Sequence, residues 1–401
     1  MVVVGLGLIG SGALRHLAID GVDVVGIGPA EPDAFATHDG VFASHYDSGR
    51  ITRKLDRRFE WAELACRSIA EYPTIASDGG VDFHVPAGAV FASTDASHIA
   101  ALDAVGRRVG ADHRILGSAA SGLPTTSNGR VLAADGLLAV PAGSTVVVEP
   151  GPAGFIDPRR MLRAQLAAAG RHGATVVRSE AVSIEPLGGG AGAGWTVTAA
   201  DGTSVTAPWV LVATGAHTDE VGPARQRFVG RVRPEVVVLA TLGAAEQERL
   251  ASLPSVLAHL SGSSLADLYQ VPPTTYPDGS VRLKLGATKR EWEPLATGAQ
   301  RRAWMSGNDH EGWLDELSGL MEDLVPGIVA ESWETNPCMI TDTPSGLPTV
   351  DHLGPGLVVA AGGNGYAAKS ADAIGALAAG LLVSGEWSDD ALDHDGFKLV
   401  T

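Results

Sequence analysis

Met1-Val-Val-Val-Gly-Leu-Gly-Leu-Ile-Gly-Ser-Gly-Ala13 is the stretch that decides the fold. Its valine run has no polar position, which predicts a buried strand. Gly5, Gly7 and Gly10 follow with the spacing GxGxxG, and helix-forming residues come next. In a strand–turn–helix unit these glycines permit a tight turn, let the backbone approach a pyrophosphate and let the helix pack on the strand. A chance turn is the alternative in a chain with 51 glycines, but the flanking strand and helix favour a dinucleotide site.

Composition limits the classes of protein to which the chain can belong. The 401 residues predict two or three domains, and 45% hydrophobic with 19% charged residues is typical of a soluble globular protein. A net charge of −17 argues against nucleic acid or an anionic membrane surface as a partner. Two cysteines, Cys66 and Cys338, indicate a reducing compartment. With a core strand expected at residue 2 and no long apolar run, we expect no signal peptide and a cytoplasmic protein.

The nucleotide-binding unit departs from the usual pattern at the ribose. The second strand is expected at residues 22–27, and an acidic residue at its end would bind the ribose hydroxyls. Gly28 stands there instead, and Glu31 is the nearest acid. Either Glu31 reaches back, or the ribose is held by other groups.

Further elements are expected along the chain. Helices are predicted at about residues 59–70 and 99–109, and a third begins at Pro158 with Asp157 as its N-cap. The other expected elements are a strand at 174–177, a meander over 181–212 with a hairpin loop at 186–194, antiparallel strands with two helices over 222–334, buried strands running into small residues at 210–216 and 356–365, and a helix at 370–382.

These elements predict an α/β protein whose Rossmann-like βαβ domain is split in sequence. The nucleotide-binding parts are residues 1–80, 151–222 and 335–401, the last with a C-terminal tail. Residues 81–150 and 223–334 are expected to form an α+β substrate domain with an antiparallel sheet.

Several motifs occur in the order found in one enzyme family, over nearly the whole length. On them the chain resembles the flavin-dependent amine oxidases of the monomeric sarcosine oxidase and N-methyltryptophan oxidase type, within the wider D-amino-acid-oxidase-like fold. The motifs are Gly5-x-Gly7-x-x-Gly10, Ser44-His45 with Arg50-Ile-x-Arg53, Leu283-Lys-Leu-Gly286, Pro337-Cys-Met339 with Asp351 beyond it, and Gly362-x-x-Gly365-x-x-x-Lys369.

The resemblance implies FAD as the cofactor, with its pyrophosphate over residues 7–10. Cys338 matches the family cysteine that bonds to the flavin 8α-methyl through sulfur, whereas sequence chemistry alone favours an inert buried thiol. The cofactor-binding residues implied are Gly5, Gly7, Leu8, Ile9, Gly10, Glu31, Ser44, His45, Arg50, Gly215, Cys338, Gly362, Gly363, Asn364, Gly365 and Lys369.

The resemblance also implies the catalytic cations. Lys284 matches the family lysine that promotes reaction with O2, because a fixed cation stabilises the negative charge that develops on oxygen. Arg50 matches an arginine near the flavin. On alternation alone, Lys284 and Arg282 could instead lie on one solvated face of their strand.

Substrate contacts are implied in the same way. Arg53 and Lys369 match the residues that bind the substrate carboxylate, and Tyr269 matches an aromatic residue that lines the pocket. Thr288 stands where the family has a histidine, and Tyr366 lies in the turn before Lys369. Both positions bear on which amine is the substrate.

The sequence therefore predicts an FAD-dependent oxidase of an N-methylated or cyclic secondary amino acid. Hydride passes to flavin N5, the imine hydrolyses and O2 is reduced to H2O2. The expected partners are a small anionic amino acid and O2, with no metal, and a monomer is favoured although the sequence does not decide the oligomeric state. The alternatives are a related flavin dehydrogenase or D-amino-acid oxidase acting on a primary amine, an NAD-dependent dehydrogenase, and a flavin-binding sensor or structural protein.

Overall fold

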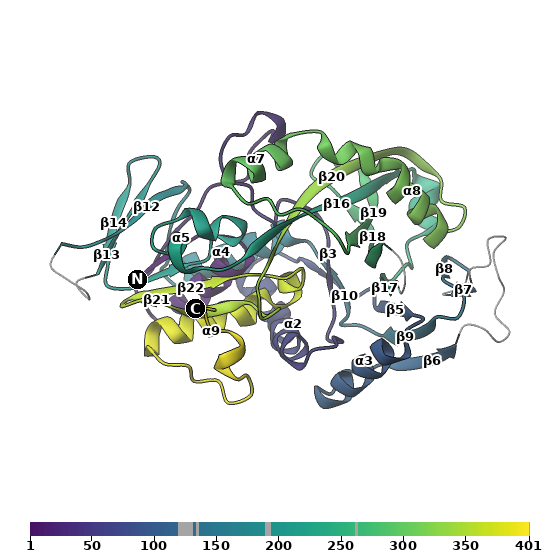
Figure 1. Ribbon diagram of the computed structural model, residues 1–401, viewed down its shortest axis with the longest axis horizontal. Helices are drawn as coiled ribbons and strands as arrows, with labels where there is room; N and C mark the ends of the chain where they lie inside the picture. The colour runs from purple at the N-terminus through teal and green to yellow at the C-terminus, as the bar shows by residue number, and fades with distance from the viewer. Residues whose placement is uncertain (119–130, 134–135, 189–193, 261–263, 401) are drawn as a thin grey trace.

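The computed structural model describes residues 1–118, 131–133, 136–188, 194–260 and 264–400. Within these residues the two largest sheets have six and eight strands, in the orders β11-β2-β1-β15-β22-β21 and β20-β16-β19-β18-β17-β5-β9-β6. Figure 1 shows them in opposite halves of the molecule. Part of the hairpin loop expected at 186–194 lies outside the described residues, which omit 189–193.

The four inner strands of the six-stranded sheet, β1, β2, β15 and β22, are short and apolar, whereas the edge strands β11 and β21 carry polar residues. All its neighbouring strands pair in parallel except β21 and β22. Strands covered on both faces read as continuous apolar runs, which explains why the valine run was recognisable. The strands are β1 (Val2–Val4), β2 (Val25–Ile27), β11 (Thr175–Val177), β15 (Val210–Val212), β21 (Thr349–Gly354) and β22 (Leu357–Ala361).

Two expectations for this sheet are wrong in detail. The second strand begins at Val25 rather than at residue 22, because the amide of Val22 instead donates to Leu17 O at the end of the first helix. Val210–Val212, expected as the end of the meander, pairs in parallel with β1 and β22. A fully buried strand has two faces to cover, and its place in the six-stranded sheet covers both.

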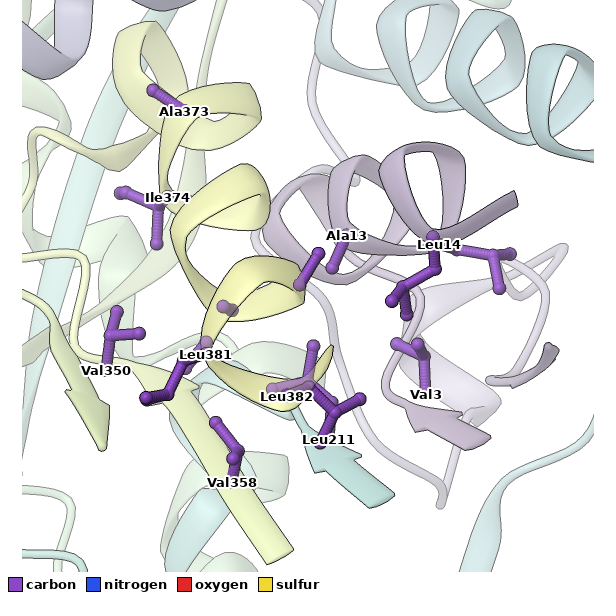
Figure 2. Close-up of a cluster of buried hydrophobic side chains, with 14 of the residues drawn as sticks. Val3, Ala13, Leu14, Leu211, Val350, Val358, Ala373, Ile374, Leu381 and Leu382 are labelled. Carbon is purple, nitrogen blue, oxygen red and sulfur yellow. The ribbon is translucent and has the colours of Figure 1, made fainter. Parts of the chain in front are cut away.

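Helices α1 (Leu8–Ile19), α4 (Pro158–Arg171) and α9 (Ala371–Ser384) pack together on this sheet. Figure 2 shows side chains of α9 and α1 meeting those of the strands. A Cβ at Gly375 would lie 2.6 Å from Ala13 N, so close packing of α9 on α1 requires glycine there. Asp157 caps α4 as predicted, and accepts the amide of Arg160 at 3.0 Å.

Two further helical features bear on the fold. Helix α2 (Phe59–Gly79) continues well past residue 70, because its buried face continues through Tyr72 and Ile75 in spite of Pro73. Residues Ala367–Ser384 are long and apolar enough to cross a membrane, but 61% of the segment is buried inside the protein, as is typical of a core helix.

The eight-stranded sheet forms the other half. Its strands are β5 (Ala89–Ser93), β6 (Arg114–Ser118), β9 (Thr145–Glu149), β16 (Arg231–Leu242), β17 (Ser255–His259), β18 (Leu265–Thr275), β19 (Val281–Lys289) and β20 (Ala330–Asp342). The two helices expected over 222–334 are α7 and α8, and two short helices were missed. The two short helices are α5 (Ala224–Arg227) and α6 (Ala244–Arg249). The other helices are α3 (Ala96–Arg108), which precedes this segment, α7 (Gly298–Ser306) and α8 (Leu314–Leu324).

Smaller sheets connect and flank these halves, and the expected domain segments remain a prediction. The small sheets are β3 (Arg50–Thr52) with β10 (Gly154–Ile156) and β4 (His84–Val85), β12 (Ala181–Pro186) with β13 (Trp195–Ala199) and β14 (Ser204–Ala207), and β7 (Val131–Ala133) with β8 (Leu138–Val140). The long strand β20 runs across the boundary expected at 334/335.

Candidate active site

A cavity of about 420 Å³ is lined by residues of both large sheets and of the loops between them. It contains almost every site residue expected from the sequence. Those lining it are Gly5, Gly7, Leu8, Ile9, Ser44, His45, Arg50, Arg53, Gly215, Tyr269, Lys284, Thr288, Cys338, Gly362, Gly363, Asn364, Gly365, Tyr366 and Lys369. Gly10 and Glu31 are not part of its wall.

The first glycine turn is tightly packed. Gly5 has φ +92°, and a Cβ on it would lie 2.5 Å from Ala213 O. A Cβ on Gly10 would overlap the carbonyl oxygen of Gly5. Gly7 is the N-cap of α1 and has no side-chain capping bond, so the first amides of the helix are free for an anion.

Packing explains why glycine, and not the expected ribose-binding acid, stands at position 28. A Cβ on Gly28 would lie 2.7 Å from the amide nitrogen of Leu6, so no acidic side chain fits there. Glu31 is paired with Arg159, 2.6 Å from Nη2, and Arg159 also donates to Ser48 Oγ at 2.8 Å. A ribose contact by Glu31 therefore stays a prediction, and it would have to compete with this ion pair.

His45 provides a test of whether the cavity fits a bound nucleotide. Its ring is buried, Nδ1 has no hydrogen-bond partner in the described chain, and a Cβ on Gly7 would lie 4.0 Å from Nδ1. Burial lowers the pKa of His45 to about 3, so the ring is neutral near pH 7. Leaving such a group unpaired costs about 1–3 kcal/mol. A ligand seated on the glycine turn would supply the partner, so these residues fit FAD.

The second glycine turn, after β22, faces the same cavity. Asn364 has φ +49°, its Nδ2 donates to Gly362 O at 2.7 Å, and its Oδ1 accepts the Thr343 amide at 2.8 Å. Gly365 follows with φ +79°. The side chain of Asn364 thus fixes the conformation of this turn, and residues of the turn line the cavity.

Lys284 lies inside the protein rather than on a solvated face. Its side chain is 2% exposed, and Nζ donates to Asp47 Oδ2 at 2.9 Å and to the carbonyl of Gly49. Burial and the nearby Arg50 guanidinium lower the pKa of Lys284 well below its ordinary value. The Asp47 carboxylate acts in the opposite direction, because a neighbouring anion favours the ammonium form.

Arg50 joins this group to Cys338. Its guanidinium pairs with Asp47, and Nη2 lies 3.0 Å from Ser44 O and 3.6 Å from Cys338 Sγ. Cys338 is a half-buried free thiol. The thiol expected to bind the flavin therefore lies beside the arginine expected near the flavin.

Arg53 and Lys369 meet at one carboxylate, that of Asp56. Asp56 Oδ2 lies 3.1 Å from Arg53 Nη1 and 3.0 Å from Lys369 Nζ, and all three side chains are buried. Although burial raises it, the two cations hold the pKa of Asp56 well below its ordinary value. Burial lowers the pKa of Lys369 to about 8. The Arg53 guanidinium lies 5.8 Å from the ring centre of Tyr366 and 5.4 Å from that of Phe91.

The remaining predicted residues line the substrate-domain side. Tyr269 stands over Gly286, whose Cβ would collide with the ring, and burial raises the pKa of its phenol. Thr288 Oγ1 donates to Glu235 Oε1 at 2.9 Å, and Glu235 is paired with Arg233. Burial raises the pKa of Glu235 to about 7.

Sequence reasoning missed the acids that position these cations. Asp47 and Asp56 each lie three residues from their arginine, in segments without helical periodicity. Glu149 accepts the amides of Lys54 and Leu55 at 2.7 and 3.0 Å and so fixes the chain next to Arg53. The described residues contain no group of three or more His, Cys, Asp or Glu side chains placed to hold a metal.

Comparison with known proteins gives the family. The model of the DAO family, described as FAD dependent oxidoreductase, matches residues 1–381. No curated protein matches the chain.

Solved structures show the same fold at low sequence identity. NikD, an unusual amino acid oxidase essential for nikkomycin biosynthesis, is 18% identical with a TM-score of 0.73, over 99% of this chain and 96% of its own. Glycine oxidase from Geobacillus kaustophilus is 21% identical with a TM-score of 0.71, over 100% and 97%. Iminodiacetate oxidase from Chelativorans sp. BNC1 is 17% identical with a TM-score of 0.69, over 99% and 98%.

Proposed function

Because the chain belongs to the DAO family of FAD-dependent oxidoreductases, we propose that it oxidises a secondary amino acid, N-methylated or cyclic, and uses O2 as the electron acceptor. One observation carries the proposal: the buried pair Arg53 and Lys369 lines the same cavity as buried Lys284. These side chains would provide a carboxylate site and, in Lys284, a cation for reduced oxygen within one cavity. The similar structures include enzymes named as oxidases of amino acids and of iminodiacetate.

The charges near Arg53 suit one substrate carboxylate. The two cations share a single carboxylate in direct contact, that of Asp56, so this cluster of three groups carries one net positive charge. The nearby carboxyl of Glu149 is bound by the amides of Lys54 and Leu55, and burial raises its pKa. In a buried site a net charge attracts a counter-ion strongly, and guanidinium binds a carboxylate through two hydrogen bonds. The aromatic rings of Phe91 and Tyr366 beside Arg53 would cover the apolar part of the substrate.

When FAD is bound, it supplies the redox chemistry, namely acceptance of a hydride from the carbon beside nitrogen and delivery of the electrons to O2. Lys284 would stabilise the negative charge that appears on oxygen. Asp47 keeps its ammonium in place, and Arg50 sits between Asp47 and Cys338. Tyr269 and Thr288 line the part of the cavity that the substrate would fill.

Oxygen uptake with a panel of N-methyl and cyclic amino acids tests the proposal. We expect uptake with at least one of them and one H2O2 per O2. The organic products are formaldehyde and the free amino acid if hydride leaves the N-methyl carbon, a 2-oxo acid and methylamine if it leaves Cα, or a cyclic imine from a cyclic substrate. Turnover with an artificial acceptor and none with O2 would identify a dehydrogenase. Uptake with primary amino acids only would identify an oxidase of the D-amino-acid type, and no turnover at all would favour a sensor or structural flavoprotein.

Covalent flavin attachment through Cys338 makes a simple prediction. A thioether survives denaturation, so acid-precipitated protein should stay yellow, and the Cys338→Ser protein should release its colour into the supernatant. Cys66→Ser is the matched control, because that half-buried thiol does not line the cavity. Colour in the supernatant from the unmodified protein would exclude the covalent bond and leave FAD binding intact.

Lys369 predicts how carboxylate binding depends on pH. Its pKa is about 8, so the charge is present below this pH and is lost as the pH rises through it. We expect the affinity for pivalate to fall by up to about tenfold per pH unit above 8, and the affinity for the neutral pivalamide to change little. Calorimetry on the holoenzyme measures both. In Lys369→Met the affinity for pivalate should no longer fall as the pH rises above 8. Equal pH profiles for pivalate and pivalamide in the unmodified protein would contradict a carboxylate site at Lys369.

A further inference from the structure

Part of the cavity wall is a polar row that the proposed function does not use. The row crosses the eight-stranded sheet at one register: Thr288 of β19 pairs with Asp267 of β18, and Asp267 pairs with His259 of β17. Figure 1 shows these strands side by side. The ring of His98, on α3, stacks on that of His259 with centroids 4.3 Å apart. All four side chains line the cavity.

The row next to it, two residues along each strand, is apolar. Tyr269 pairs with Gly286 on one side and with Leu257 on the other, and Leu257 pairs with Phe91. Because side chains two residues apart share one face of a sheet, both rows face the same space about 7 Å apart. The cavity therefore has an aromatic and aliphatic floor beside Arg53, and a polar end.

The free groups of the polar row are mainly hydrogen-bond acceptors. Asp267 Oδ1 accepts a hydrogen bond from His259 Nδ1 at 2.9 Å, and Asp267 Oδ2 has no partner in the described chain. The Thr288 hydroxyl uses its proton on Glu235, so its lone pairs remain. His98 Nδ1 is buried without a partner in the described chain, and burial lowers the pKa of His98 to about 4, so the ring is neutral near pH 7 and Nδ1 can accept in the Nε2–H tautomer.

The charged side chains around the polar row also favour a ligand group that donates hydrogen bonds. Arg233 is flanked by two carboxylates, those of Glu235 and Asp342, and its own charge is more than neutralised. Asp267 adds a further negative charge, and the exposed Arg57, which also borders the cavity, adds one positive charge. Because the pKa of Glu235 is raised to about 7, its carboxyl is partly protonated near pH 7, and the net charge of this end lies between zero and minus one, against the positive end at Arg53 and Lys369.

We propose that the row of Thr288, Asp267, His259 and His98 is a specificity subsite for the substrate side chain, and that it selects amino acids whose side chain carries a hydrogen-bond donor. This inference rests on the proposed function, because it takes the substrate carboxylate to lie at Arg53. The side chain would then cross the apolar row and place its donor at Asp267 Oδ2.

Isosteric pairs of ligands test the subsite. N-methylthreonine and N-methylvaline differ by a hydroxyl against a methyl group, and Nα-methylornithine and N-methylnorleucine differ by an ammonium against a methyl group. Dissociation constants are measured by calorimetry on the photoreduced holoenzyme under nitrogen, because a reduced flavin cannot oxidise the ligands. We expect the donor member of at least one pair to bind about tenfold more tightly, the effect of one hydrogen bond to a charged acceptor.

Two variants decide whether Asp267 is responsible. Asp267→Leu, which keeps the shape and removes both acceptors, should abolish the preference. Asp103→Leu is the matched control, because Asp103 forms the same kind of pair with His113, at 3.0 Å, outside the cavity wall. Absence of any donor preference in the unmodified protein, or an unchanged preference in Asp267→Leu, would overturn the subsite. Oxidation of the two members tests the proposed function separately, since that function requires turnover of an N-methyl amino acid and not a difference between members.

Discussion

Replacing Lys284 with methionine is expected to slow the reaction of the reduced enzyme with O2 by about 10²–10³-fold, while reduction by substrate changes little. Transfer of electrons to O2 creates negative charge abruptly, and a fixed cation in a dry site stabilises that charge. Methionine keeps the length and the apolar stem of lysine. Asp47 retains Arg50 as a partner, so its buried carboxylate is not left unpaired and the fold should survive.

Stopped-flow absorbance separates the two half-reactions. The photoreduced variant is mixed with oxygenated buffer, and recovery of the oxidised flavin spectrum gives the rate. Lys289→Met is the matched control on the same strand, because Lys289 lies 3.9 Å from Glu316 and over the ring of Trp313, away from the cavity. Reoxidation of Lys284→Met at the speed of the unmodified protein would remove Lys284 from the oxygen reaction.

Replacing Arg53 with alanine is expected to weaken an amino-acid substrate by more than about tenfold relative to an uncharged amine of the same shape. The loss of a charge-assisted hydrogen bond in a buried site costs on the order of 1.5–3 kcal/mol. Asp56 then neutralises Lys369, so the net positive charge that faces the substrate disappears. Because Asp56 keeps one partner at 3.0 Å, the variant should fold and bind FAD.

The measurement is kcat/KM for an N-methyl amino acid and for its carboxamide, in the variant and in the unmodified protein. Arg58→Ala is the control, because this arginine follows five residues later, is 42% exposed and donates to Ser345 O at 2.7 Å at the surface. Equal losses for the acid and the amide in Arg53→Ala would place the carboxylate site elsewhere in the cavity.

The central sheet and the glycine turns could be predicted because they depend on local rules. Three-residue strands covered on both faces show as continuous apolar runs, and Gly5 and Gly10 are required wherever a helix packs this closely on a strand. Gly28 is the instructive exception. Its sequence position suggested a lost ribose contact, whereas the structure shows a packing requirement set by Leu6, which no local pattern reveals.

The acidic half of the site depends on long-range contacts and was not predictable. Asp47 bonds to Lys284, 237 residues away, and Asp56 bonds to Lys369, 313 residues away. The resemblance to known oxidases identified the cations, because each stands in a recognisable motif. It gave no indication of Asp267, whose pairing with His259 follows only from the register of β17 and β18.

Anaerobic mixing with substrate is the most direct test of whether the enzyme oxidises a secondary amino acid, because it isolates the reaction of the amine from that of O2. Holoenzyme is mixed under nitrogen with an N-methyl or cyclic amino acid, with the corresponding primary amino acid, and with the carboxamide of the first. We expect rapid and complete bleaching of the flavin absorbance by the secondary amino acid, and slow or no bleaching by the other two. Rapid bleaching by the primary amino acid or the carboxamide, with none by the secondary amino acids, would contradict it.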